Sequence, residues 1–163
     1  MSAQAAANLQ VPHRPRLRFP SLEWFSALAQ LMNENRALHE HLGYVDCVAE
    51  FAVDDAGPHG QPVAYQVTFE EFSAADVRLA TDPTRADFRI SGPLWAWRDM
   101  IESIAQHGGR PALDRTLNHL THMGEPLRVT SNDPLRRDLY FRYNQSLQEF
   151  LNASARIDTE FSR

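Results

Sequence analysis

Two histidine groups carry the residue types that most readily bind a metal ion. His119 and His122 are spaced i, i+3 on a predicted helix, and His39-Glu40-His41 forms a second group. Imidazole and carboxylate ligands suit zinc and related ions. Local spacing supplies no third ligand beside His119 and His122, so exposed helix histidines are expected there. We predict no metal and no other cofactor.

Cys47 is the one cysteine of the chain. It lies within an alternating apolar run, which favours a small buried hydrophobe over a nucleophile, because a nucleophilic thiol needs a pocket and a neighbouring base. The sequence contains no phosphate-binding Gly-rich motif and no Gly-x-Ser-x-Gly nucleophile elbow. We therefore predict that the protein is not an enzyme.

Charged side chains alternate with apolar ones along the predicted strands. On a half-buried sheet they would share the face opposite the core, where cross-strand ion pairs in water are the expected arrangement. An anion site on this face is the alternative interpretation. The residues concerned are Asp46, Glu50, Glu70, Arg78 and Arg89.

Composition limits the function further. The chain has 163 residues and a formal net charge of −5, and all sixteen of its basic residues are arginines. An acidic chain has no general attraction for nucleic acid or anionic membranes. No apolar segment has the length of a signal peptide core or a membrane span, so we predict neither nucleic-acid binding nor integral membrane association, and a cytoplasmic location.

Period-2 alternation predicts the strands of a single sheet. Residues 45–53 and 63–69 read as a β-hairpin, because the intervening 54–62 is rich in Gly and Pro. Further short strands are expected at 77–79, 88–90 and 127–129. The sheet should be mainly antiparallel.

Helical periodicity predicts the elements that cover this sheet. A first helix is expected from Ser21, as N-cap, to about Gly43, and a central helix after the turn at Ser91-Gly92-Pro93. A second helix should run to Gly124, with its apolar side facing inward. Asp133 and Pro134 should open the last helix. The inward side of the second helix comprises Leu113, Leu117, Leu120 and Met123.

Composition also suggests where the domain begins and ends. Residues 1–19 are Ala/Gln-rich and then Arg/Pro-rich, which indicates a flexible N-terminal arm. Residues 20–152 should form one α+β domain, and 153–163 a C-terminal tail. Trp95 projects away from the apolar stripe of the central helix, so the arm or the first helix is expected to cover it; a contact surface is the alternative.

Two local motifs resemble the sterol carrier protein 2 (SCP2) family. The stretch from Ala86 to Trp97, ADFRISGPLWAW, is similar to the family's strand that ends in Gly and leads into a helix. The stretch from Met123 to Asn132, MGEPLRVTSN, is similar to its Gly-Lys-Leu-x-hydrophobic-x-Gly-Asp strand, with Glu125 in place of the Lys and Pro126 inserted. The pattern covers about residues 22–151.

The resemblance implies a five-stranded sheet whose helices enclose an apolar cavity. The family binds or transfers fatty acids, acyl-CoA or sterols in such a tunnel without making or breaking bonds. The alternatives are an interaction module that joins a homodimer or a partner enzyme and, last, a small-molecule enzyme. The inner stripes suggest as ligand-binding residues Phe69, Phe88, Trp97, Met100, Ile101, Ile104, Leu117, Leu120, Met123, Leu139 and Tyr143.

Overall fold

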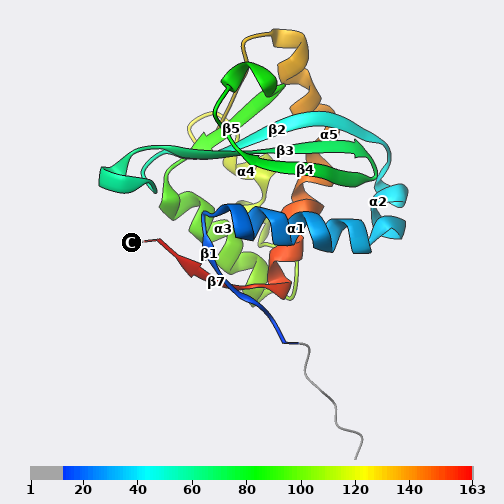
Figure 1. Ribbon diagram of the computed structural model, residues 1–163, viewed down its shortest axis with the longest axis vertical. Helices are drawn as coiled ribbons and strands as arrows, with labels where there is room; N and C mark the ends of the chain where they lie inside the picture. Colours follow the sequence, from blue (N-terminus) through cyan, green and yellow to red (C-terminus); the bar gives the residue numbers. More distant parts are fainter. Residues whose placement is uncertain (1–12, 163) are drawn as a thin grey trace, which may run out of the picture.

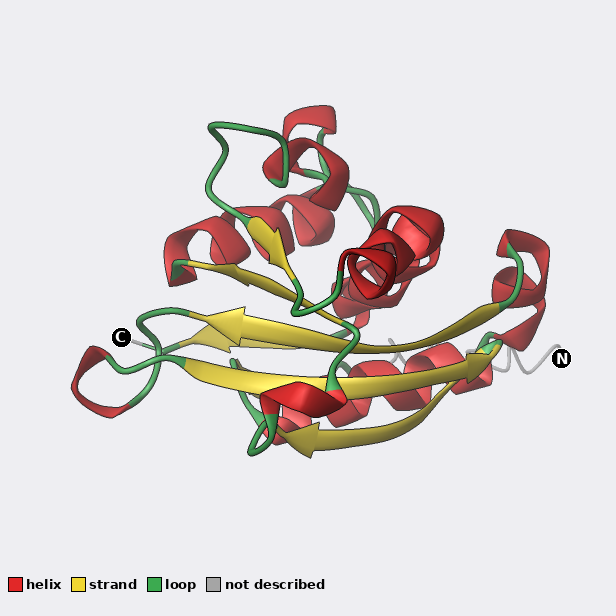
Figure 2. Cartoon of the chain, turned by 90° about the horizontal axis from the view of Figure 1, so that it is seen from above, coloured by secondary structure: helices red, strands yellow, loops and turns green. Residues whose placement is uncertain are grey.

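Five strands form a sheet that lies through the middle of the molecule (Figure 2). The computed structural model describes residues 13–162. The strand order is β4-β3-β2-β5-β6, with every neighbouring pair antiparallel except β2 and β5. This confirms the predicted α+β class with a five-stranded, mainly antiparallel sheet. The strands are β2 (Val45–Val53), β3 (Val63–Glu71), β4 (Ser73–Leu79), β5 (Phe88–Gly92) and β6 (Arg128–Thr130).

Helices cover one face of this sheet. In Figure 1, α1 and α3 lie on the same side of the strands, and α1 contacts β3 and β4 while α5 contacts β2 and β5. The face that receives them is called the inner face below. The helices are α1 (Leu22–Glu34), α2 (Arg36–Leu42), α3 (Leu94–Gln106), α4 (Leu117–Leu120) and α5 (Pro134–Asn152), and four short 3₁₀ turns are η1 (Pro58–Gly60), η2 (Pro83–Arg85), η3 (Leu113–Arg115) and η4 (Ala153–Arg156).

Both predicted N-caps are confirmed. The Trp24 amide donates to Ser21 Oγ at 3.0 Å, and the Leu135 amide donates to the Asp133 carboxylate at 2.9 Å. Each bond satisfies a helix N–H that has no intrahelical partner. The first helix, by contrast, does not continue to Gly43: it is interrupted at Asn35, whose N–H turns back to the Met32 carbonyl at 3.0 Å, and α2 then begins.

The turn from β5 into α3 requires glycine. A Cβ at Gly92 would lie 2.9 Å from the Pro126 carbonyl oxygen and would collide with the Leu127 side chain. The missing side chain therefore lets the segment before β6 pack closely against the end of β5. The two motifs on which the family resemblance rests are thus in contact.

Aromatic rings fill the space between the inner face and the helices. The Phe25 and Phe51 centroids are 5.4 Å apart, and the Phe69 and Phe150 centroids 5.1 Å apart. Trp97 is fully buried, and its indole Nε1 donates to the Ala52 carbonyl at 3.0 Å, so its one polar atom is satisfied inside the core. The core therefore joins sheet, α1, α3 and α5.

The ends of the described chain pair with each other, which differs from the predicted arm and tail. Strand β1 (Arg16–Phe19) runs parallel to β7 (Asp158–Phe161), on the far side of α1 and α3 in Figure 1. Phe19 is fully buried, and Trp24 Nε1 donates to Thr159 Oγ1 at 3.1 Å. Strand pairing and one buried aromatic thus hold polar sequence in place on both sides of the predicted boundaries at 20 and 152. The rest of the predicted arm, residues 1–12, lies outside the described residues.

The predicted second helix is reduced to the single turn α4. The Leu127 amide donates to the Leu120 carbonyl at 3.0 Å, so the chain turns back toward β6 directly after Leu120. Leu117 and Leu120 are buried, but Leu113 and Met123 are exposed on the surface and do not face inward. Trp95 is also 57% exposed, so the expected cover over it is absent from the described residues.

Candidate functional site

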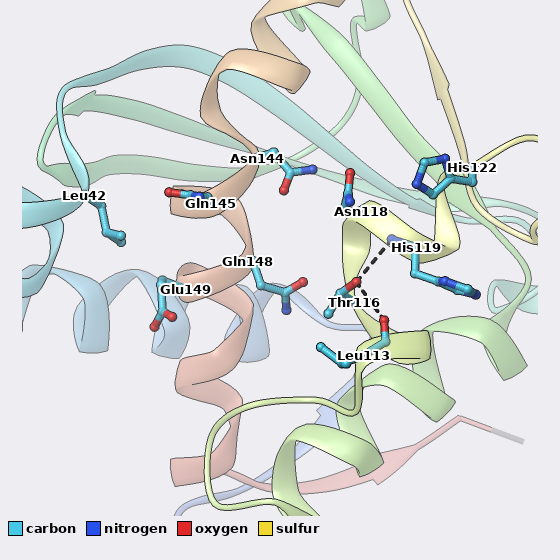
Figure 3. A pocket seen from close by; sticks show the side chains of 10 residues that line it. All are labelled: Leu42, Leu113, Thr116, Asn118, His119, His122, Asn144, Gln145, Gln148 and Glu149. Atoms are coloured by element: carbon cyan, nitrogen blue, oxygen red, sulfur yellow. Dashed lines mark hydrogen bonds between the residues drawn. The ribbon is translucent and has the colours of Figure 1, made fainter.

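Two adjoining surface hollows lie along α5, and together we call them the α4–α5 groove. Their volumes are about 510 and 470 Å³. The α5 side chains face α4 and η3 across the larger one, with Leu42 of α2 at its edge (Figure 3). The residues that line both hollows are Leu42, Asn118, Asn144 and Gln145.

Carboxamide side chains give the groove its chemical character. Gln148 accepts a bond from the Leu117 amide at 2.7 Å and donates to Asn152 Oδ1 at 2.9 Å, so it joins α4 to α5. Asn144 donates to the Tyr140 hydroxyl at 3.1 Å. Amide groups bond neutral polar partners through both donor and acceptor atoms. The groove wall is therefore suited to hydroxyl, carbonyl or amide groups of a ligand.

A pair of hydroxyl groups, one of them on a buried side chain, lies behind this wall. The Tyr140 hydroxyl is 2.9 Å from Thr121 Oγ1, and the Tyr140 ring is fully buried against Phe88, with centroids 5.7 Å apart. Burial raises the pKa of Tyr140 above its ordinary value, because the phenolate would lose its hydration. Tyr140 therefore serves as a neutral hydrogen-bonding group.

The histidines line the groove without forming a metal centre. His119 Nε2 lies 3.6 Å from Glu125 Oε1, and the His119 and His122 rings are 6.5 Å apart. Residues 13–162 contain no group of three or more His, Cys, Asp or Glu side chains placed to hold a metal ion. Absence of a metal remains a prediction for the protein as a whole.

Most of the predicted ligand-binding residues are brought together, but in a filled core. The predicted apolar cavity is not shown, because their side chains occupy the space between sheet and helices. Leu139 and Tyr143 are half-buried at the edge of this core, and Tyr143 also lines the groove. Met123 is fully exposed and lies apart from the others. The buried ones are Phe69, Phe88, Trp97, Met100, Ile101, Ile104, Leu117 and Leu120.

Two buried titratable groups lie on the inner side of the molecule. Cys47 is 3% exposed, and burial raises the pKa of its thiol far above the usual range, so no thiolate nucleophile is available. His39 on α2 is 3% exposed, and its Nδ1 has no hydrogen-bond partner among the described residues. Burial lowers the pKa of His39 because the imidazolium would be desolvated.

The outer face of the sheet is not uniformly solvated as predicted. Glu50 is 2% exposed, and its Oε2 lies 3.4 Å from Arg89 Nε. The predicted cross-strand ion pair therefore exists, but on the carboxylate side it is buried, because the segment around η2 crosses over it. A second ion pair on this face, Arg78 with Asp76, is exposed.

Sequence reasoning missed the amide residues of the groove. Asn144, Gln145 and Gln148 follow one another at helical spacing on the polar side of α5. A run of carboxamides in place of charged residues was the available signal. Their partners from α4 and α2 could not be found from sequence, because only the tertiary fold brings Asn118 and Leu42 beside them.

The described chain has no helix with the length and apolar character needed to cross a lipid bilayer.

Comparison with known proteins shows an SCP2-like fold. No family model and no curated protein matches the sequence. The crystal structure of sterol carrier protein 2 is similar with a TM-score of 0.61 and 18% identity, covering 83% of this chain and 95% of that one. A solution structure from Thermus thermophilus, described as a possible sterol carrier protein, has a TM-score of 0.59 and 17% identity, covering 83% of this chain and 88% of that one. The likeness establishes the fold.

Proposed function

We propose that this chain, from its SCP2-like fold, binds or transfers a hydrophobic small molecule such as a fatty acid, acyl-CoA or sterol in the cytoplasm. The observation that carries the proposal is the match of 83% of the chain to sterol carrier protein 2. Each methylene removed from water contributes about 0.8 kcal/mol, so an acyl chain needs apolar surface and no catalytic group. Binding without chemistry also suits the neutral Tyr140 and Cys47.

The ligand would enter beside the first half of α5. Leu147 and Phe150, in the second half, are fully buried. In the first half Tyr140 is the one fully buried side chain, whereas Leu139 and Tyr143 are half-buried and Leu135 is exposed. A close-packed interior admits a ligand only where a segment can separate from it. The first half of α5 is therefore the proposed cover, and the second half a permanent wall.

The ligand's apolar part would then contact the predicted ligand-binding residues, among them Phe69 and Tyr143. Met123 is excepted because it is exposed. The ligand's polar end would remain in the α4–α5 groove, since Tyr143 belongs both to the core edge and to the groove. The carboxamides there would bond a hydroxyl or carbonyl group of the ligand.

Exchange of a fluorescent fatty acid tests this proposal. Leu139→Ala and Tyr143→Ala should accelerate exchange several-fold with a modest loss of thermal stability, because they loosen the cover. Leu135→Ala, an exposed position on the same helix, is the matched control and should change neither quantity. Absence of fatty-acid binding by the parent protein contradicts the proposal. Complete unfolding of both variants would show that the first half of α5 is a permanent part of the core and not a cover.

An assembly role is the second candidate, favoured by the exposed indole of Trp95 on α3. Large exposed aromatics are typical of protein contact surfaces. Native mass spectrometry of freshly purified protein distinguishes the two functions in one spectrum. A co-purified ligand on a single chain supports transport, while a homodimer or a bound partner enzyme that is lost on Trp95→Ala supports assembly.

A further inference from the structure

A row of polar side chains crosses the outer face of the sheet, the face opposite the helices. The strand register places Glu50 beside Gln66 on β3 and beside Arg89 on β5. The same register continues from Gln66 to Arg78 on β4 and from Arg89 to Thr130 on β6. One residue from each of the five strands thus lies in a line.

The centre of this row is buried by the segment that contains η2. Gln66 Nε2 donates both to Glu50 Oε1 and to the Asp82 carbonyl, each at 2.9 Å. Arg136 of α5 holds the same segment, donating to the Ala86 carbonyl at 2.7 Å and to the Asp87 carboxylate at 3.0 Å. In Figure 1 this short green turn lies across the sheet from α1 and α3. Glu50 is therefore a buried carboxylate on the non-core face.

A buried carboxylate is costly unless hydrogen bonds and an opposite charge compensate it. Here Gln66 satisfies one oxygen, and the Arg89 Nε edge faces the other. An apolar residue at position 50 would avoid the cost. Unlike an apolar residue, Glu50 orients Arg89, because its carboxylate pairs with the Nε edge of the guanidinium.

Arg89 borders a hollow of about 200 Å³ next to Glu50. Pro83 and Ala86 line it on one side, and Thr130 and Asn132 on another. Within residues 13–162, the terminal nitrogens of Arg89 and the exposed side chains of Thr130 and Asn132 have no hydrogen-bond partner from the protein. Arg89, Thr130 and Asn132 therefore each offer a hydrogen-bond donor to this hollow.

We propose that this hollow binds a small carboxylate. With its Nε edge toward Glu50, the guanidinium keeps the edge formed by its two terminal nitrogens for a ligand, and that edge matches the two oxygens of a carboxylate. The Thr130 hydroxyl and the Asn132 amide supply further donors. A volume of about 200 Å³ limits the ligand to a small acid.

The charge of the hollow favours a monoanion over a dianion. Glu50 already balances the charge of Arg89, so bound acetate leaves one net negative charge beside the pair, whereas a phosphate dianion leaves two. A neutral amide of the same shape lacks the ion pair. The site therefore predicts a preference for acetate over both inorganic phosphate and acetamide.

Backbone amide spectra of the ¹⁵N-labelled protein, recorded at constant ionic strength, test this preference. Acetate should produce saturable shifts confined to residues 84–89 and 130–132, and acetamide and inorganic phosphate should not. Equal responses to all three probes, or no saturable response to acetate, overturn the proposal.

Variants then identify the residues responsible. Arg89→Gln combined with Glu50→Gln removes both charges and keeps similar shapes, and it should weaken acetate binding at least about tenfold. Arg78→Gln, at the opposite end of the same row, is the matched control and should bind like the parent. Undiminished binding by the double variant, or equal loss in the control, refutes the assignment.

A second variant tests the site even if the first variant does not fold. Thr130→Val with Asn132→Ala leaves the Glu50–Arg89 pair intact and should weaken acetate binding several-fold. Unchanged acetate binding would show that Thr130 and Asn132 do not form part of the site, which contradicts the proposal. None of the substituted side chains is among the residues proposed to contact a fatty acid, so fatty-acid binding should be unaffected, and the two proposals can fail independently.

Discussion

The two faces of the sheet obtain their order in opposite ways. On the inner face, side chains such as Phe51 and Trp97 are fully buried and need only matching shapes and one indole hydrogen bond. On the outer face, Glu50 is almost as deeply buried but depends on Gln66 and Arg89. Apolar burial tolerates imperfect partners, whereas a buried charge requires specific ones.

His39, on the inner side of the molecule, provides a second comparison with Glu50. It is buried to nearly the same extent as Glu50, yet its Nδ1 has no partner among the described residues. A group that can become neutral avoids the cost of burial by losing its proton. The protein thus buries one titratable group with partners and one without, and the two should respond differently to substitution and to pH.

The largest effect is expected from the inner face. Trp97→Ala should lower the free energy of unfolding by about 3–5 kcal/mol, because it leaves a cavity in the aromatic core. Trp95→Ala on the same helix should change it by less than about 0.5 kcal/mol, since Trp95 is largely exposed. Urea unfolding of the two variants measures both values. Similar losses for the two tryptophans would show that the inner face is not the principal core.

A smaller effect is expected on the outer face. Arg89→Leu should cost about 1–3 kcal/mol, because it leaves the Glu50 carboxylate buried without its cation. Adding Glu50→Leu should recover most of that loss, since apolar residues can replace a buried ion pair at little cost. A double-mutant cycle followed by urea unfolding provides the coupling energy. Simple addition of the two single losses would contradict a coupled pair.

The smallest effect concerns pH. Burial lowers the folded-state pKa of His39 from the ordinary value of 6.5, so the unfolded chain binds a proton first as pH falls. The stabilisation from neutral His39 is complete above pH 6.5 and is lost between that pH and the lower folded pKa. Thermal unfolding from about pH 7.5 to about pH 5 should therefore show a steeper decline for the parent than for His39→Leu.

His41, an exposed histidine on the same helix, supplies the control for this experiment. His41→Gln should retain the pH dependence of the parent. If His39→Leu loses stability on acidification as steeply as the parent does, another group is responsible.

The sequence by itself determined the classes of element and much of their order. Alternation located β2 and its hairpin partner β3, because a half-buried strand needs one apolar face, and the caps Ser21 and Asp133 were evident from their residue types. The two short motifs at Gly92 and Gly124 were sufficient to indicate an SCP2-like fold. These features depend on local physics that a few neighbouring residues define.

Tertiary structure decided the features that join distant parts of the chain. Strand β1 acquires its order from β7, about 140 residues away in sequence, and polar sequence gives no local sign of that pairing. The same holds for α4, which is shortened by the turn toward β6, and for Met123, which is left in solvent. An apolar residue is buried only where another element covers it.

The candidate sites divide in the same way. Periodicity predicted that the proposed ligand-binding residues would be on the apolar side of their elements. Whether such residues enclose a cavity or pack against one another depends on the tertiary structure, and here they pack into the core. The α4–α5 groove and the hollow at Arg89 depend on segments that meet only after folding. Sequence determines which side chains prefer to leave water, and the fold determines which polar groups are enclosed with them, because enclosure is a property of the whole chain.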